Sequence, residues 1–339
     1  MTAHSSDVEK TGVESSIFDL EDHDMARLVY QATSQIPRGM VSTYGAIARA
    51  LGDIRAARAV GMILSENPTP IVVPCHRIVY NDGNVGWYSG KGCGKEKKEY
   101  LLAEEGVSIV DGKVVDLPGR LFTDFDIEPL LNKMRLRQEE LYPSVIVEDD
   151  FPELNSFSGL DVAYQGNEAF AVRVDQDATS GRITGSIFKN GTVQFPYVPT
   201  YLTYRELPIL AQLIDRTRQD IVYLIDGQGT LHPRRFGIAC HLGVCLDIPT
   251  IGVAKSLLVG NVEENGEEVS PIKIDGTTLG FRLSAPGHKP LYISVGNRVS
   301  LKTAVQIARK ATKDKERDPL RIADRLSKER RKNLPSVEE

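Results

Sequence analysis

One aspartate in the second half of the chain constrains the fold more than any other residue. Gly159-Leu160-Asp161-Val162-Ala163 is a short apolar run of the kind that forms a buried strand, and Asp161 interrupts it. A carboxylate in an apolar strand is costly unless it is paired or bound to a metal. The fold must therefore bring positive charge, from a side chain or a metal ion, to this strand.

The segments around Asp161 alternate between strands and helices. Apolar runs rich in β-branched residues predict strands, and leucine or isoleucine at helical spacing predicts helices. We expect strands at residues 159–163, 169–174 and 183–188, a helix at 204–216, a strand at 221–225, a helix at 235–246 and a strand at 250–254. This order predicts a mixed α/β sheet with helices on its faces.

Two more acidic residues fall where they can join Asp161. Glu206 lies in the first turn of the helix at 204–216, and Asp226 ends the strand at 221–225. The arrangement resembles that of ribonuclease H-like nucleases, in which carboxylates gather around a divalent metal. Mg²⁺, or alternatively Mn²⁺, prefers oxygen ligands and can activate water for attack on a phosphodiester. The alternatives are that Asp226-Gly227 is a turn and that Glu206 is an acid favoured by the helix dipole.

A second constellation lies in the first half of the chain. An apolar run at residues 71–73 leads directly into Pro74, Cys75, His76 and Arg77. A thiol reacts as the thiolate, and a neighbouring imidazole and guanidinium lower its pKa. The alternative is a buried cysteine in a strand, with the histidine and arginine facing solvent.

Two short helices precede this stretch. Ser42 or Thr43 can cap a helix at 44–51, which ends at Gly52, and a second helix is expected at 55–65. Two helices joined by a tight glycine-containing turn predict a helix-turn-helix, whose second helix contacts DNA. The alternative is an ordinary helical hairpin with solvated arginines. Longer helices are expected at 17–35, 127–141 and 304–326.

Composition limits the function classes. A length of 339 residues allows two domains, and the four cysteines include no CxxC pair that would indicate a zinc ribbon. The net charge of −5 counts mildly against a nucleic-acid binder, although basic patches at 49–58, 91–98 and 328–332 can bind phosphate. The basic run at 328–332 is either a solvated helix end or a phosphate-binding arm. The polar segment 1–16 is expected to be disordered. Because the sequence predicts no signal peptide and no membrane span, we expect an intracellular protein that is cytoplasmic and associated with the nucleoid. We also expect a monomer.

Residues 36–106 resemble the active-site domain of O6-alkylguanine-DNA alkyltransferases. The resemblance is carried by GMVSTYGAIARALG, RAARAVGMILSENPTPIVVPCHRIV, GWYSG and KKEYLLAEEG, in that order. It implies a mainly α, winged helix-turn-helix domain in which Cys75 accepts the alkyl group, His76 acts through water as its base and Glu105 orients His76. The other implied roles concern DNA: Asn67 as hinge, Arg58 as the finger that fills the duplex, Tyr44 in base rotation, Tyr88 along the flipped base and Lys98 beside the acceptor.

The first half departs from that family in two ways. The separate amino-terminal domain of typical alkyltransferases is missing, since only about 16 leader residues precede the first predicted helix. Glu104 stands where many relatives have histidine. Alkyltransferase-like proteins that only bind lesions have another residue at the position of Cys75, so its presence favours the active branch.

Residues 128–325 resemble endonuclease V. Six motifs carry this resemblance: GLDVAY, PYVP, YRE, DGQG, HPRR and IGVAK. It implies an α/β, ribonuclease H-like domain that cuts the second phosphodiester 3′ to deoxyinosine. The resemblance implies that Asp161, Glu206 and Asp226 are metal ligands and that His232 lies by the metal and the scissile phosphate. Lys255 would neutralise phosphate charge, and Arg205 would contact DNA. The segment 196–199 would act as a wedge that separates the strands, with Tyr197 stacking in the gap.

Two histidines of many relatives are replaced in the second half. Gln228 stands in the Asp-Gly-Gln-Gly motif, and Asn297 stands where many relatives have a histidine near the catalytic metal. An amide can bind metal-held water but does not titrate near neutral pH. The rate, metal preference or pH dependence can therefore differ from theirs.

Together the patterns predict two functional domains in one chain. We expect a disordered leader at 1–16, an alkyltransferase domain at 17–116, a linker at 117–127 and a nuclease domain at 128–339. The partner is double-stranded DNA that contains O6-alkylguanine or deoxyinosine. Two alternatives stay open: the first domain only binds alkylated lesions and recruits the nuclease, or the nuclease acts on inosine in RNA.

Overall fold

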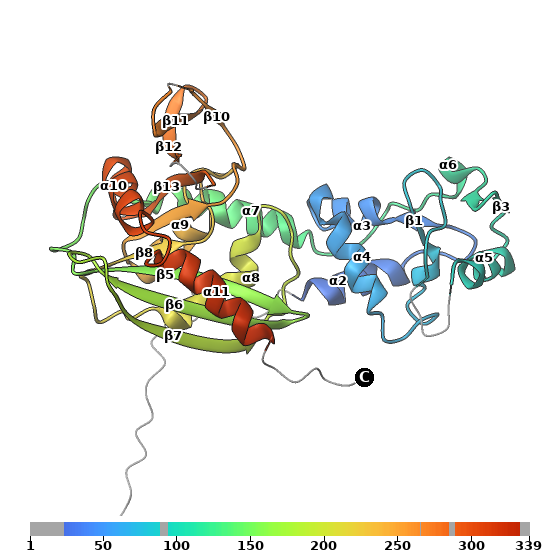
Figure 1. The fold of residues 1–339 in the computed structure, drawn as a ribbon. Coiled ribbons are helices and arrows are strands. Elements are labelled where there is room, and N and C mark those ends of the chain that lie inside the picture. The colour runs from blue at the N-terminus through green and yellow to red at the C-terminus, as the bar shows by residue number, and fades with distance from the viewer. Residues whose placement is uncertain (1–23, 89–93, 265, 285–288, 333–339) are drawn as a thin grey trace, which may run out of the picture.

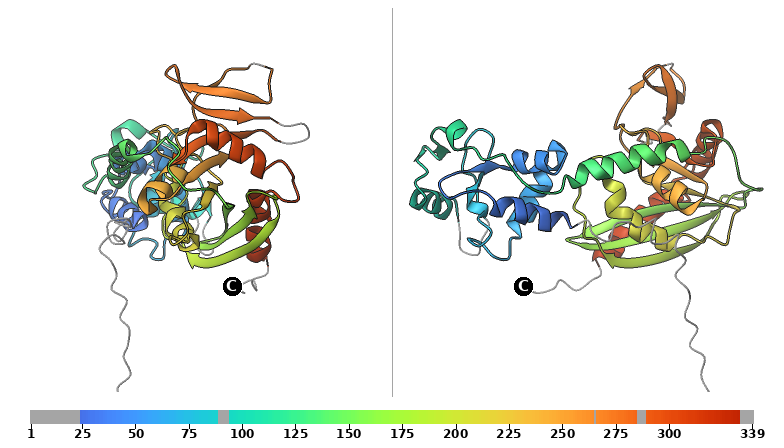
Figure 2. Two further views of the ribbon diagram at one scale, coloured as in Figure 1. Left: turned by 90° about the vertical axis from the view of Figure 1, so that its left-hand side faces the viewer. Right: turned by 180° about the vertical axis from the view of Figure 1, so that it is seen from behind.

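The computed structural model describes residues 24–88, 94–264, 266–284 and 289–332. The chain forms two lobes that lie side by side, with α2 (Met25–Ser34), α3 (Tyr44–Ala50), α7 (Leu130–Leu141) and α8 (Leu202–Leu210) near their junction (Figure 1). Residues 24–122 build the smaller lobe, and the larger lobe contains the main sheet (Figure 2). The leader predicted at 1–16 lies outside the described residues. The helix predicted from residue 17 is described from Met25 onward.

The smaller lobe is mainly helical, with short strand pairs between its helices. Its elements are α2 (Met25–Ser34), β1 (Ser42–Thr43), α3 (Tyr44–Ala50), η1 (Ile54–Ala56), α4 (Ala57–Ser65), η2 (Cys75–Arg77), β2 (Ile78–Val79), α5 (Lys95–Glu104), β3 (Ile109–Val110), β4 (Lys113–Val114) and α6 (Leu117–Arg120). β1 pairs with β2 in parallel, and β3 pairs with β4 antiparallel.

Local chemistry explains the helix pair α3 and α4. The Thr43 hydroxyl caps α3 by accepting from the Ala46 amide at 3.0 Å. Gly52 then turns the chain with φ +105°, a conformation that favours glycine. A Cβ at this position would also lie 2.6 Å from the Asn132 amide nitrogen, so the larger lobe packs directly against the turn. Asp53 caps the next turn, η1, which leads into α4.

The cysteine stretch is not a strand. Cys75–Arg77 forms a single 3₁₀ turn, and the strand Ile78–Val79 begins only after it. The chain already turns at Ile71, whose φ is +81°, and the Cys75 amide then donates to the Val73 carbonyl at 2.8 Å. The apolar run at residues 71–73 gave no sign of these turns.

Residues expected to form a linker pack on the smaller lobe. α6 begins at Leu117, and beyond it the Phe122 amide donates to the Val41 carbonyl at 2.8 Å. Arg120 Nη1 donates to the Gly39 carbonyl at 2.9 Å. The crossing to the larger lobe follows Phe122, and α7 (Leu130–Leu141) then contributes Leu130 to the core of the smaller lobe.

The larger lobe is built on a nine-stranded mixed sheet. Its order is β10-β11-β12-β13-β9-β8-β5-β6-β7. β8 is parallel to β5 and to β9, and the other neighbours are antiparallel. The strands are β5 (Ser156–Gln165), β6 (Glu168–Asp177), β7 (Ile183–Thr192), β8 (Ile221–Ile225), β9 (Thr250–Ala254), β10 (Asn261–Val262), β11 (Val269–Ile274), β12 (Thr277–Leu283) and β13 (Leu291–Asn297). The predicted mixed sheet is confirmed, and β8 and β9 have the bounds that were expected. The strands β10–β13 were not predicted.

Helices cover both faces of this sheet. α8 (Leu202–Leu210) and α9 (Ile238–Leu246) pack on one face with Leu160, Tyr223 and Ile225. α10 (Leu301–Ala311) and α11 (Pro319–Lys332) pack on the other face. No helix in the described ranges is long and apolar enough to cross a membrane.

The single helix expected at 304–326 is two helices. Pro319 starts α11, because proline is tolerated in a first helical turn but not inside a helix. α11 then lies across β5 and β6 (Figure 1). Gly159 of β5 permits this packing, since a Cβ there would meet Leu320 N and Pro319 C at 2.5 Å.

Candidate active sites

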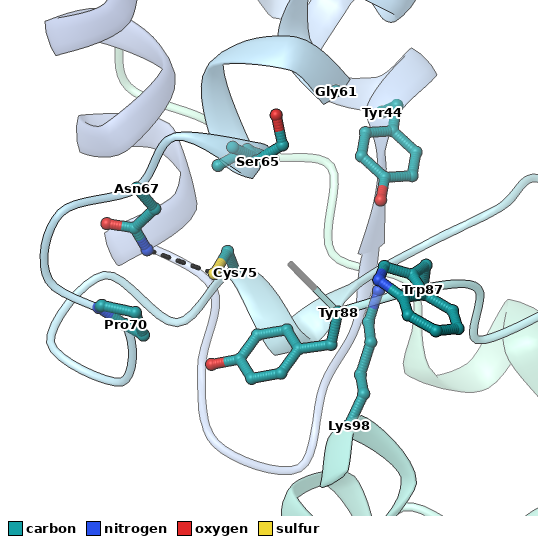
Figure 3. A pocket seen from close by; sticks show the side chains of 10 residues that line it. Tyr44, Gly61, Ser65, Asn67, Pro70, Cys75, Trp87, Tyr88 and Lys98 are labelled. Atoms are coloured by element: carbon teal, nitrogen blue, oxygen red, sulfur yellow. Dashed lines mark hydrogen bonds between the residues drawn. The ribbon is translucent and has the colours of Figure 1, made fainter. Parts of the chain in front are cut away.

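Cys75 is one of the residues that line a small cavity in the smaller lobe (Figure 3). Its side chain is 9% exposed, and Asn67 Nδ2 donates to its Sγ at 3.1 Å. Asn67 Nδ2 also lies 3.0 Å from the Val73 carbonyl oxygen. The predicted hinge residue therefore contacts both the thiol and the loop that carries it.

Cys75, His76 and Glu105 come together from η2 and the end of α5. His76 Nε2 donates to Glu105 Oε1 at 3.0 Å, and Arg77 donates to both Glu105 oxygens at 2.7 and 2.8 Å. Burial raises the pKa of Glu105, but the bonds from Arg77 and His76 outweigh it and lower that pKa to about 2. The ionised carboxylate holds the proton of His76 on Nε2.

His76 is therefore arranged as a neutral base. Burial lowers its pKa below 6.5, although Glu105 opposes that shift. Its Nδ1 is buried and has no hydrogen-bond partner among the described residues. With the proton on Nε2, the free lone pair of the ring belongs to Nδ1.

The other predicted residues of this site line the same hollow. Figure 3 shows Tyr44 and Tyr88 on opposite sides of the cavity, with the Lys98 ammonium pointing toward it. Lys98 is 1% exposed, and burial lowers its pKa to about 8. Arg58 is exposed and lies apart from Cys75, on the rim of an adjoining hollow of about 520 Å³ that also contains Tyr44 and Trp87.

Three aspartates form an acidic cluster in the larger lobe. Asp161 of β5, Asp226 after β8 and Asp324 of α11 each place one carboxylate oxygen within 4.8 Å of the others. Lys255 bridges two of them, with Nζ 2.5 Å from Asp226 Oδ2 and 2.9 Å from Asp324 Oδ1. The Ser327 hydroxyl donates to Asp161 Oδ2 at 2.7 Å. Burial raises the pKa of Asp161 to about 7, the Ser327 bond opposes that rise, and Asp226 adds to it.

This oxygen-only donor set fits a hard divalent cation. Three carboxylates at this separation repel one another unless a proton or cation lies among them, as the raised pKa of Asp161 records. Mg²⁺ and Mn²⁺ take carboxylate and water oxygens as ligands. Asp161, Asp226 and Asp324 are therefore the residues that could hold such an ion.

Glu206 lies beside the cluster but outside the group of close carboxylates. Its Oε1 accepts from the Tyr164 hydroxyl at 2.9 Å. Burial raises its pKa to about 8, the Tyr164 bond opposes that rise, and Asp161 and Asp226 add to it. Its role as a ligand stays a prediction. Arg205 lies 4.2 Å over the Tyr164 ring and donates to the Phe195 carbonyl at 2.7 Å, so it supports the start of the predicted wedge.

A cavity of about 250 Å³ joins the predicted wedge to the acidic cluster. Tyr197, Asp226, His232 and Lys255 lie along it, and the Tyr197 side chain is 57% exposed. His232 Nε2 donates to the Thr200 carbonyl at 3.0 Å, and its Nδ1 accepts from the Arg234 amide at 3.3 Å. Burial and then Arg234 lower the pKa of His232 to about 3. Both ring nitrogens therefore bond to protein, and His232 is not part of the close carboxylate group.

The two replaced histidine positions have different surroundings. Gln228 lies on the 250 Å³ cavity and donates to the Ser256 carbonyl at 2.8 Å. Asn297 was expected near the metal, but its side chain is bonded elsewhere. Its Nδ2 donates to the Gly243 carbonyl at 3.0 Å, and its Oδ1 accepts from the Ile146 backbone amide at 3.0 Å. Asn297 thus ties β13 to α9 and to the loop at Ile146. Asp324 is the additional polar residue at the acidic cluster.

Sequence reasoning missed Asp324 and Ser327. Asp324 lies near the end of the helix predicted at 304–326, and Ser327 lies just beyond that helix. They are three residues apart and hence on one helical face, a spacing that could have indicated a shared polar site. The sequence offered no sign that this face would lie on β5.

Comparison with known proteins agrees with this two-site organisation. Residues 24–107 match the DNA binding domain of 6-O-methylguanine DNA methyltransferase, and residues 139–325 match Endonuclease V. The bifunctional methyltransferase/endonuclease of Picrophilus torridus is 35% identical over 93% of this chain and 100% of its own length. The chain belongs to the bifunctional methyltransferase/endonuclease family.

Solved structures cover the endonuclease V part of this family member. Endonuclease V from Streptomyces avermitilis is 33% identical, with a TM-score of 0.54 over 59% of this chain and 92% of its own. Ciona intestinalis endonuclease V, solved in complex with a 24mer DNA containing an inosine followed by a ribo-adenosine, is 28% identical, with a TM-score of 0.55 over 60% of this chain and 98% of its own. The larger lobe therefore has the endonuclease V fold.

Proposed function

We propose that the smaller lobe removes the alkyl group from O6-alkylguanine in DNA and keeps it on Cys75. The observation that carries this proposal is the bonded series His76–Glu105–Arg77 beside a buried thiol. The Cys75 proton passes through a water to His76 Nδ1. The sulfur–carbon bond then forms as the carbon–O6 bond breaks, and guanine leaves with that electron pair and takes a proton from solvent. The thioether is stable, so each molecule acts once.

The surrounding residues would bring the lesion to the thiol. A base inside a duplex must be turned out before its O6 substituent can be reached. We propose that α3 and α4 form a winged helix-turn-helix, in which exposed Arg58 enters the duplex as the base leaves. Tyr44 and Tyr88 would flank the flipped base, because both line the cavity at Cys75.

The mass of the intact protein tests this transfer. After incubation with a duplex that contains O6-methylguanine, the protein should gain one methyl group, located on the Cys75 peptide. EDTA should not affect the gain, because no residue of this site requires a metal. Tight binding to the same duplex without a mass gain would instead support the lesion-binding alternative.

We propose that the larger lobe hydrolyses the second phosphodiester 3′ to deoxyinosine, and that Asp161, Asp226 and Asp324 hold Mg²⁺ or Mn²⁺ there. The observation that carries this is the approach of three carboxylates within 4.8 Å beside Lys255. A bound ion supplies activation of water and neutralises the phosphate. Lys255 would offer further positive charge to the phosphate, and Glu206 would complete the acidic shell.

The 250 Å³ cavity would receive the displaced hypoxanthine base. Exposed Tyr197 would stack in the gap that the base leaves, as the wedge 196–199 separates the strands. We propose that residues 17–116 and 128–339 are the two functional domains, joined by residues 117–127, of which Arg120 and Phe122 bond to the smaller lobe.

Mapping the cut at single-nucleotide resolution tests this proposal. A duplex with one deoxyinosine should be nicked between the first and second nucleotides 3′ to it, leaving 3′-hydroxyl and 5′-phosphate ends. Cutting elsewhere, or without added Mg²⁺ or Mn²⁺, would contradict it. A competing inosine-containing RNA distinguishes the RNA alternative, since that substrate should then be cut first.

A further inference from the structure

The two lobes are joined at a buried polar contact next to the predicted wedge. The Tyr201 hydroxyl donates to Asp53 Oδ2 at 3.0 Å across the boundary. Tyr201 is 0% exposed and Asp53 is 8% exposed. Asp53 also accepts from the Arg55 amide at 3.0 Å and thereby caps the turn that leads into α4. One carboxylate thus connects the predicted DNA-binding helix of one domain with the other domain.

Asp53 is charged in this position. Burial raises its pKa, but hydrogen bonds from Arg55 and Tyr201 outweigh burial and lower it. A hydrogen bond to an ionised acceptor is about twice as strong as one between neutral groups. The contact is also shielded from water, because Tyr201 and Val198 belong to the same hydrophobic cluster as Leu51.

On the nuclease side, Tyr201 ends the segment that carries Tyr197. The Arg234 guanidinium lies 4.4 Å over the Tyr201 ring and donates to Thr200 Oγ1 at 3.0 Å. His232 donates to the Thr200 carbonyl at 3.0 Å. Thr200 has φ +70°, which is unfavourable for a β-branched residue. The segment therefore holds a strained backbone whose fixed end depends on these contacts.

We propose that Asp53 and Tyr201 are positioning residues for nicking, through which the alkyltransferase domain holds the nuclease wedge in place. The proposal rests on the proposed nuclease function. Separating stacked strands requires a wedge that does not yield, and Tyr201 is the end of the wedge segment anchored to the other domain. Single-stranded DNA needs no separation, so its cleavage does not depend on this anchor.

Tyr201→Phe in the full chain tests the proposal, because it removes one hydroxyl and keeps the ring. We expect kcat/KM for deoxyinosine in a duplex to fall about tenfold, as for loss of a hydrogen bond to a charged group. For the same lesion in a single strand it should change less than about twofold. Asp53→Ala should reproduce the duplex defect, and the double variant should be no worse than either single variant.

Tyr223→Phe is the matched control. Tyr223 is also fully buried, and its hydroxyl lies 3.3 Å from the Asp215 amide nitrogen, within the nuclease domain. This variant should affect duplex and single-stranded substrates alike. An unchanged duplex rate in Tyr201→Phe, or equal losses on both substrates, would overturn the proposal.

Amide hydrogen exchange of the DNA-free full chain separates this proposal from the nuclease assignment. Exchange at Val198, Thr200 and Tyr201 should be several-fold faster in Tyr201→Phe and Asp53→Ala than in wild type or Tyr223→Phe. Unchanged exchange would refute the anchor, whether or not the protein nicks DNA. If exchange is faster in the variants but the wild-type protein never nicks deoxyinosine DNA, the Asp53–Tyr201 contact does hold the segment in place. The proposed nuclease function, and with it the role of this contact in nicking, would then be refuted.

Discussion

Asp324→Asn is the sharpest test of the acidic cluster, because the variant keeps the side-chain shape and removes one charge. Two unit charges 4 Å apart interact by about 1 kcal/mol in water and about 4 kcal/mol at an effective dielectric constant of 20. The Asp324 side chain is 26% exposed, so its environment lies between these limits. We expect a divalent cation to bind about 2 kcal/mol more weakly, which is roughly 30-fold.

The assay compares the Mn²⁺ concentration for half-maximal nicking with Mn²⁺ affinity from calorimetry. Both should shift by roughly 30-fold in Asp324→Asn, whereas methyl transfer to Cys75 should not change. Asp314→Asn is the control, because Asp314 is an exposed acid in the turn before α11. Its carboxylate pairs with Arg317 at 3.6 Å and accepts from the Glu316 amide at 3.0 Å. An unchanged Mn²⁺ requirement in Asp324→Asn would show that α11 is no part of the metal site.

Three further changes probe both lobes. Cys75→Ser should abolish the methyl mass gain and leave nicking at the wild-type rate, and loss of both activities would refute independent sites. Glu105→Gln removes the charge that raises the pKa of His76, so single-turnover transfer should slow roughly tenfold. In the wild type, the pH at which the transfer rate falls by half should lie below 6.5, because burial lowers the pKa of His76. Gly159→Ala places a Cβ 2.5 Å from Leu320 N, so chemical denaturation should show the larger lobe destabilised by about 1–3 kcal/mol. The rate of nicking should fall as well. An unchanged free energy of unfolding would contradict the close approach of α11 to β5.

Local sequence signals were sufficient for the centre of the sheet. β8 and β9 have the predicted bounds, because each is a five-residue apolar run that is buried along its whole length. The strands β10–β12 escaped prediction because they are partly polar and lie toward one edge of the sheet. β13, which pairs with β9, was also not predicted. The apolar run before Cys75 left a buried strand open as the alternative, and the structure has a 3₁₀ turn at Cys75–Arg77 instead.

The long-range parts of the sites could not be derived from local patterns. The Cys75 site was within reach, because its motif segments lie within 70 residues and match one family in order. Asp324 lies 163 residues after Asp161, and only the packing of α11 on β5 brings them together. The same holds for Asp53 and Tyr201, which are 148 residues apart and meet only because the lobes are in contact.

The central claim is that one chain carries two independent chemistries. Its most direct test takes a single preparation, measures methyl transfer from O6-methylguanine DNA by intact mass in EDTA, and then measures nicking of deoxyinosine DNA after Mg²⁺ is added. We predict one methyl group per molecule without metal, followed by multiple-turnover nicking by the same methylated protein. Failure of transfer in EDTA, or of nicking once Cys75 is methylated, would contradict the claim.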